Sequence, residues 1–308
     1  MISDVGDIAR RRTQPPRIRS QETSRTRVRR AMLAPLVILL LLLTIYPTVY
    51  AVVASLFSTR QGTPAFVGLG NYIEKFGDPV FQQSIAITLV FTIAAVGLEL
   101  VLGLAVALVL FDMRGEHRLI RALLLLPMAA TPVAVLFGWK VILDPSLGVL
   151  NWMIGDVLGL ARPDWLGTPG MALGTLIGVD VWQWTPFVMI ILFGGLTAVS
   201  GEVVEAALID GAGWWTRLRY VILPALQPYL MVAVLFRGVD ALKTFDSIQV
   251  LTGGGPGSST TTINVYAFKQ GIQFLDFGSG SAAAIILLIV AMAFGKLASR
   301  FMAKEAYA

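Results

Sequence analysis

Ionisable residues that interrupt long apolar stretches are the first candidates for chemistry in this chain of 308 residues. Arg237, Asp240 and Lys243 follow one another at three-residue spacing, and side chains three apart meet on a helix surface. Asp180 is the acidic residue of another apolar stretch. Charged side chains inside a membrane are costly and mark solute pathways or paired sites. These residues therefore predict either a polar cavity or a self-neutralising ladder of ion pairs that serves only packing.

Aromatic side chains accompany Asp180. Trp184 and Phe187 flank Pro186, whose ring removes one helical hydrogen bond and frees a carbonyl group. A carboxylate is a strong acceptor for hydroxyl groups, and indole rings suit the faces of sugars. This combination predicts a site for a hydroxylated solute, whereas an aromatic belt at the membrane interface is the alternative.

Residues that catalysis and metal binding require are scarce. The chain has no cysteine and a single histidine, His117, so thiolate chemistry and a multi-histidine metal centre are excluded. The Gly-x4-Gly-Lys-Ser/Thr, His-Glu-x-x-His and Gly-x-Ser-x-Gly motifs are all missing from the sequence. We expect no catalytic residue, no metal site and no cofactor in this chain, and a solvated loop position for His117.

The elements that must position these residues are long apolar segments. Hydrophobic residues make up 56% of the chain and charged residues only 14%, against about a quarter charged in ordinary soluble domains. A membrane-spanning helix needs roughly 20 mostly apolar residues. We expect an all-α, polytopic integral membrane protein with six transmembrane helices, because barrel strands would alternate in polarity. The six segments are 31–57, 82–111, 119–143, 171–199, 221–251 and 278–301.

Basic residues predict the orientation of these spans. With the N-terminus in the cytoplasm, the inner segments hold 17 of the 24 Lys and Arg residues and the outer segments hold four. This asymmetry predicts that both ends are cytoplasmic. The tail 1–30 holds nine Arg, and we expect it to be disordered before the membrane orders it. It leads directly into an apolar segment, which favours contact with membrane lipid over a nucleic-acid partner.

The segment 201–224 between the fourth and fifth spans predicts a helix–turn–helix at the cytoplasmic face. Acidic residues suit the first turn of a short helix over 202–209. Asp210 and Gly211 then end it, since glycine is common just past a helix terminus. A second helix is expected from Trp214 to Pro224. The alternative is an amphipathic surface loop.

This segment resembles the EAA loop of ABC importer permeases. The family pattern is Glu-Ala-Ala, three residues, Gly, nine residues and Ile-x-Leu-Pro; here the spacing is kept and only Val221 departs, in place of Ile. Further similarities extend over 31–305 and are closest to permeases for maltose, trehalose, polyols and glycerol 3-phosphate. The matching residues are Glu205-Ala206-Ala207, Gly211, Val221-Ile222-Leu223-Pro224, Gly68-Leu-Gly-Asn71-Tyr72, Glu99, Gly103, Arg121 and Leu251-Thr-Gly-Gly-Gly-Pro256.

The resemblance implies a type I ABC importer permease fold for a transmembrane permease domain over 31–305, in the cytoplasmic membrane of a prokaryote. The implied partners are a second homologous permease subunit, two ATPase subunits that bind ATP and Mg, and an extracytoplasmic solute-binding protein. The implied cargo is a sugar or related polyol. The residues expected to couple this chain to the ATPase are Glu205, Ala206, Ala207, Asp210 and Gly211.

Carried over from maltose-type permeases, the resemblance also implies a solute pathway. At nearly all of these positions the side chains differ from those of the maltose permease. Arg237 also fits a solute that carries a phosphate or an acid group. An ion- or proton-coupled secondary transporter, with Asp180 or Glu99 as proton carrier, is the alternative function. The pathway residues are Asp180, Trp184, Phe187, Arg237, Ala241 and Thr244, with Asp240 adjacent.

Overall fold

The computed structural model describes residues 19–59, 63–113, 118–199 and 201–306. The described chain is mostly helical, and it also holds one antiparallel pair of short strands, β1 (Phe57–Ser58) and β2 (Ala65–Phe66). It divides into two compact units, one ending at Tyr50 and the other beginning at Ala51.

Helix α1 (Arg19–Ala54) provides the first apolar span, whose hydrophobic part is Met32–Ala54. The apolar part agrees with the predicted span 31–57 to within one turn, and the described helix extends from it back to Arg19, through basic residues of the predicted tail. Arg, Gln and Glu are good helix formers and extend the hydrogen-bonded turns beyond the apolar stretch. The rest of the predicted tail, 1–18, lies outside the described residues.

Four further helices of the second unit are long and apolar enough to cross a membrane. Three of them agree with the predicted second, fourth and sixth spans to within a turn and a half at each end. The second begins directly after Asp78, whose side chain accepts a hydrogen bond from the Val80 N–H and caps the helix. The four are α3 (Pro79–Asp112), α7 (Pro169–Ala198), α10 (Leu223–Leu242) and α13 (Phe277–Ala306).

The single span predicted over 119–143 is instead a pair of helices, α4 (Arg118–Ala129) and α5 (Pro132–Ile142). Their apolar parts are bent by 91°. Thr131 adopts an extended ψ of 121°, and Pro132 starts α5. A proline disfavours the helical conformation of the residue before it and donates no hydrogen bond, so the chain turns here. With this pair counted as one span, the described residues hold up to six.

The predicted fifth span, 221–251, is also interrupted. Helix α10 ends at Leu242, and α11 (Asp246–Leu251) follows after a short break. The Asn264 side chain donates a 2.6 Å hydrogen bond to the carbonyl of Lys243, and so satisfies a carbonyl that lies outside the helix. Polar residues at the break therefore end the helix well before residue 251.

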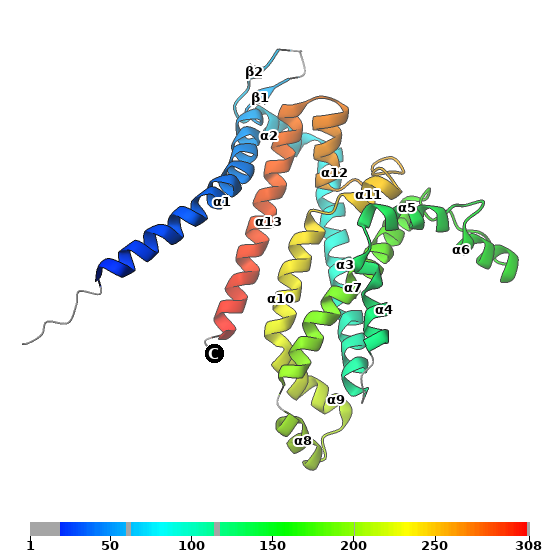
Figure 1. Cartoon of the computed structure of the whole chain (residues 1–308). Coiled ribbons are helices and arrows are strands. Elements are labelled where there is room, and N and C mark those ends of the chain that lie inside the picture. Colours follow the sequence, from blue (N-terminus) through cyan, green and yellow to red (C-terminus); the bar gives the residue numbers. More distant parts are fainter. Residues whose placement is uncertain (1–18, 60–62, 114–117, 200, 307–308) are drawn as a thin grey trace, which may run out of the picture. The chain divides into compact units, whose positions relative to one another are not determined.

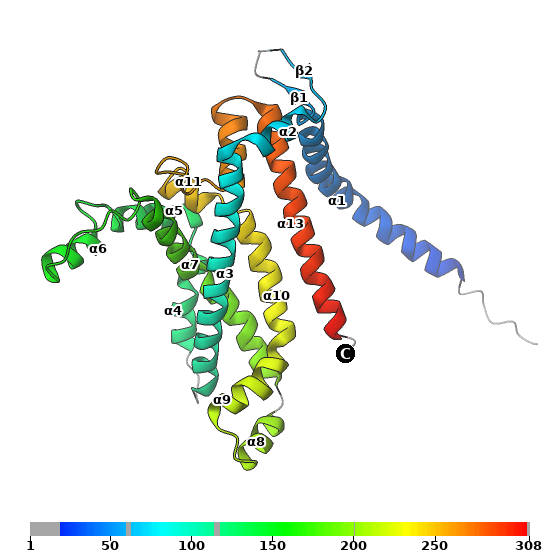
Figure 2. The ribbon, with the colours of Figure 1, turned by 180° about the vertical axis from the view of Figure 1, so that it is seen from behind.

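Small residues allow the long helices to approach closely. A Cβ atom added to Gly103 of α3 would lie 2.8 Å from Val188 of α7, and one added to Gly195 of α7 would lie 2.6 Å from Tyr229 of α10. Figures 1 and 2 show α3, α7 and α10 side by side, with buried hydrophobic residues of all three forming one cluster. Helices in membranes commonly pack through such small residues.

The segment predicted as a helix–turn–helix lies at the end of the α3–α7–α10 bundle opposite α11 (Figures 1 and 2). Its first helix, α8 (Gly201–Ile209), confirms the expected bounds. The second does not stop at Pro224: α9 (Trp214–Arg217) continues through a π-helical turn, Leu218–Ile222, into α10. Pro224, which donates no backbone hydrogen bond, follows just after this π-helical turn within the continuous helix.

The remaining elements are short. Two of them run into π-helical turns, Met153–Val157 and Lys269–Gln273. These short helices are α2 (Gly70–Gly77), α6 (Val149–Trp152) and α12 (Ile263–Phe268).

Candidate functional site

An ion cluster centred on Arg237 joins the three packed helices. Its guanidinium binds Glu99 of α3 through Nε and Nη2 at 2.6 and 2.7 Å. Nη2 also donates to Asp180 of α7 at 2.7 Å, and Nη1 to Asp240 of α10 at 2.6 Å. Arg237, Glu99 and Asp180 are 1%, 0% and 5% exposed. We refer to these four residues as the Arg237 cluster.

The Arg237 cluster differs from the ion-pair ladder that residue spacing alone suggested. Only the pair between Arg237 and Asp240 forms within one helix. Lys243 instead lies just past the end of α10. The partner that sequence reasoning missed is Glu99, although it is the only charged residue in the second predicted span. An isolated charge in a span signals a partner elsewhere, but the sequence does not say which.

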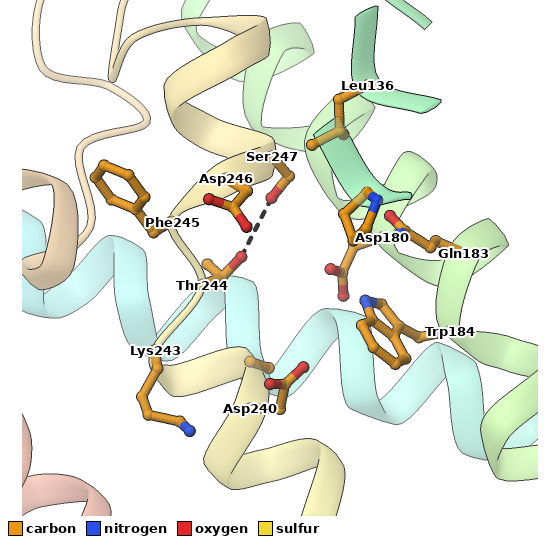
Figure 3. Close-up of a pocket in the computed structure, with 12 residues that line it drawn as sticks. Leu136, Asp180, Gln183, Trp184, Asp240, Lys243, Thr244, Phe245, Asp246 and Ser247 are labelled. Carbon is orange, nitrogen blue, oxygen red and sulfur yellow. Dashed lines mark hydrogen bonds between the residues drawn. The ribbon is translucent and has the colours of Figure 1, made fainter. Parts of the chain in front are cut away.

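Two neighbouring cavities flank the Arg237 cluster. The first, of about 160 Å³, lies between α5, α7 and the break after α10, and Figure 3 shows Asp180 and Asp240 facing each other across part of it. The second, of about 380 Å³, is mainly apolar in its lining. Trp184, Asp240 and Lys243 line both cavities.

Aromatic rings form one side of this region. The Trp184 ring lies over the Arg237 guanidinium, 4.8 Å from its central carbon. Phe187 meets Trp184 edge-on at 6.3 Å between ring centroids, and Phe236 meets Phe187 at 6.5 Å. A guanidinium on a ring face is favourable, so the Trp184 side chain is held in place by the same group that binds the carboxylates.

All predicted pathway residues lie on these cavities. Their role in solute transport remains a prediction, because lining a cavity is not itself transport. Asp180, Trp184, Asp240, Ala241 and Thr244 line the first cavity, and Trp184, Phe187, Arg237 and Asp240 line the second.

The residues predicted to couple the chain to an ATPase lie in α8 and the turn that follows it. Glu205, Ala206, Asp210 and Gly211 are exposed, while Ala207 is partly buried. Gly211 has a φ of +75°, a conformation that favours glycine, and its N–H bonds the Leu208 carbonyl at 3.0 Å. The neighbouring Ile209 is 87% exposed. The segment therefore presents small, acidic and apolar groups together on a structured surface.

Metal binding has no support from the geometry of the described ranges. No three His, Cys, Asp or Glu side chains there are arranged to hold a metal ion. The single histidine, His117, lies outside the described residues.

Known proteins resemble this chain over most of its length. Residues 32–304 match the family described as "Binding-protein-dependent transport system inner membrane component". The trehalose/maltose transport system permease protein MalF of Thermococcus litoralis is 37% identical over 265 residues, covering 85% of this chain and 89% of that protein. The trehalose transport system permease protein SugA of Mycobacterium tuberculosis is 35% identical over 274 residues, covering 86% and 87%.

Solved structures share the same fold. A chain of a bacterial ABC transporter involved in the import of the acidic polysaccharide alginate superposes with a TM-score of 0.81 at 22% identity. The superposition covers 92% of this chain and 98% of that one. The described helices therefore form an ABC importer permease fold of type I.

Proposed function

Because the chain belongs to the family of binding-protein-dependent transport system inner membrane components, we propose that it is a permease subunit of an ATP-driven importer that moves a sugar or related polyol. The observation that carries the proposal is the polar cavity among apolar helices, where Asp180 and Asp240 lie beside Trp184. Carboxylates accept hydrogen bonds from hydroxyl groups. Relatives named for trehalose and maltose transport support the same cargo class.

The proposed assembly has this chain as one half of the translocation path. A second homologous permease subunit forms the other half, and two ATPase subunits bind ATP and Mg. An extracytoplasmic binding protein delivers the solute. Alternating access then moves rigid helix bundles around a site near the bilayer midplane.

The coupling role in this proposal falls on Glu205, Ala206, Ala207, Asp210 and Gly211. Exposure of α8 at the end of the bundle supports it. The small alanine side chains permit close approach of an ATPase surface, and Glu205 offers a carboxylate to a basic partner. The left-handed Gly211 fixes the turn that follows.

The proposed location is the cytoplasmic membrane of a prokaryote, with both chain ends in the cytoplasm. The excess of Lys and Arg in alternate connecting segments supports this orientation. It places α8 and α9 on the side where ATP is available.

Reconstitution of the complete transporter in proteoliposomes tests this function. With the binding protein outside and ATP inside, labelled trehalose is expected to accumulate, and removing ATP is expected to abolish uptake. The matched control is a complex with a hydrolysis-deficient ATPase subunit. Uptake that follows a proton gradient without the ATPase would instead support the ion-coupled alternative.

A further inference from the structure

We propose that the Arg237 cluster makes the cavity selective against anionic solutes, with Asp240 presenting the decisive negative charge. The inference rests on the proposed function and narrows its substrate class to uncharged polyhydroxylated solutes, as opposed to sugar phosphates or sugar acids. Arg237 and Glu99 act as positioning residues, and Asp240 determines specificity.

Arg237 is not available to bind an anion. A guanidinium carries five N–H donors, and four of them are directed at carboxylates: two at Glu99, one at Asp180 and one at Asp240. Arg237 is 1% exposed, and the Trp184 ring covers one face of its guanidinium. A phosphate or carboxylate would have to displace Glu99 or Asp180, which would then be left buried without a partner, or compete with the charged Asp240 for Nη1.

The charges around the cavities do not balance. Lys243 and Asp246 line the cavity along with Asp180 and Asp240. With Glu99 and Arg237 included, four carboxylates face two cationic side chains. Even if one carboxyl group holds a proton, the region remains negative. Because apolar helices screen charge only weakly, this net negative charge repels an anionic solute more strongly than it would in water.

Asp240 carries this charge to the cavity surface. Its side chain is 50% exposed, whereas the side chain of its partner Arg237 is 2% exposed. Among the described residues only its Oδ2 atom is engaged, by Nη1 of Arg237. Because Asp240 lines both cavities, any solute that occupies either one meets its remaining carboxylate oxygen. That oxygen accepts a bond from a hydroxyl group and repels a phosphate.

The fold does not by itself impose this preference. The superposed permease of TM-score 0.81 belongs to a transporter of an acidic polysaccharide. Charge selectivity must therefore arise from particular side chains, and here three acidic residues converge on one arginine.

Direct binding to the purified membrane complex tests the inference. The permease pair with its ATPase subunits is used without the binding protein, so that the receptor's own selectivity does not contribute. Equilibrium dialysis compares trehalose with trehalose 6-phosphate. We expect trehalose to bind about 10-fold more tightly than its phosphate at physiological salt, since Coulomb repulsion inside the membrane is only partly screened.

The variant Asp240→Asn keeps the shape and the hydrogen bond to Arg237 but removes the charge. It is expected to tighten trehalose 6-phosphate binding about 3-fold to 10-fold and so reduce the discrimination. Asp240→Glu retains the charge and is expected to retain the discrimination. Asp112→Asn, at the exposed end of α3, is the matched control and should leave both affinities unchanged.

Equal affinities of the wild-type complex for the two sugars would overturn the inference. So would an unchanged ratio in an assembled Asp240→Asn complex. If neither sugar binds the wild-type complex, the result contradicts the proposed function itself, which distinguishes that failure from a failure of charge selectivity.

Discussion

The Arg237 cluster and the α8 segment (residues 201–211) differ in whether their charged side chains have partners within this chain. In the Arg237 cluster, carboxylates from three helices surround a buried guanidinium. In the α8 segment, Glu205, Asp210 and Ile209 are exposed. A buried charge must find its partners within the fold, whereas an exposed one is stable in water and free to meet another protein. Charges that are paired within the fold therefore indicate residues that hold the site in shape. Exposed charges on an ordered segment indicate a surface that binds another protein.

The largest effect is expected from removing the centre of the cluster. Arg237→Ala leaves two buried carboxylates, Glu99 and Asp180, without their cation, and breaking a buried ion pair costs about 3–5 kcal/mol. We expect the assembled complex to lose thermal stability strongly, as measured by fluorescence-detected size exclusion after heating. Lys243→Ala, which removes an exposed cation beside the same cavity, is the control. Equal melting of the two variants would contradict the central role of Arg237.

A large effect on transport, with little on assembly, is expected at the turn after α8. Gly211→Asp forces a side chain into a left-handed conformation, φ +75°, and adds charge to the proposed docking surface. We expect uptake to fall roughly 10-fold or more while ATP hydrolysis continues, because nonglycine residues strain this conformation by about 1–2 kcal/mol. Transport and ATPase assays on the same proteoliposomes measure the coupling.

Gly213→Asp is the matched control for this prediction. Gly213 has a φ of −64° and precedes α9 as its N-cap, a position that aspartate favours. The Gly213→Asp variant therefore adds the same charge nearby without straining the backbone. Uptake that falls equally in both variants would show that charge rather than the Gly211 conformation matters; normal uptake in Gly211→Asp would contradict the coupling assignment.

A smaller effect separates solute contact from packing within the cluster. Asp180→Asn keeps the shape of a side chain that lines the first cavity and retains an acceptor for Arg237. We expect KM for trehalose uptake to rise about 3-fold to 10-fold, since hydrogen bonds to charged acceptors are roughly twice as strong as neutral ones. The complex should remain assembled on size exclusion. A lower melting temperature with normal KM and kcat would make Asp180 purely structural.

The smallest effect concerns a third polar group, at the start of α3. Burial alone would raise the pKa of Asp78, but hydrogen bonds from Tyr266 and the Val80 N–H, together with the charge of Lys75, hold that pKa below its usual value. Its stabilising contribution is therefore present at neutral pH and is lost as pH falls below about 4 and through the folded pKa. Melting of wild type and Asp78→Asn measured from pH 7 to pH 3 should converge at the acid end. A constant difference would contradict the linkage.

Sequence patterns predicted much of this architecture correctly. The apolar segments around Glu99 and Asp180 are helices, and α8 ends where Asp210 and Gly211 indicated. The breaks after Ala129 and Leu242 were missed. Hydropathy averages over a window, so it cannot register a local change of direction at one proline or a polar break stabilised by a distant side chain such as Asn264.

Local composition and spacing alone determined that this chain is helical, membrane-embedded and similar at 205–224 to an importer coupling loop, because these properties depend on neighbouring residues. Only the tertiary structure decided that Glu99 and Asp180 are bound by Arg237. Those residues are far apart in the chain, and the spacing of Arg237, Asp240 and Lys243 pointed to a different set of partners. The physical reason is that a buried charge is neutralised by whichever groups the packing of helices brings within reach.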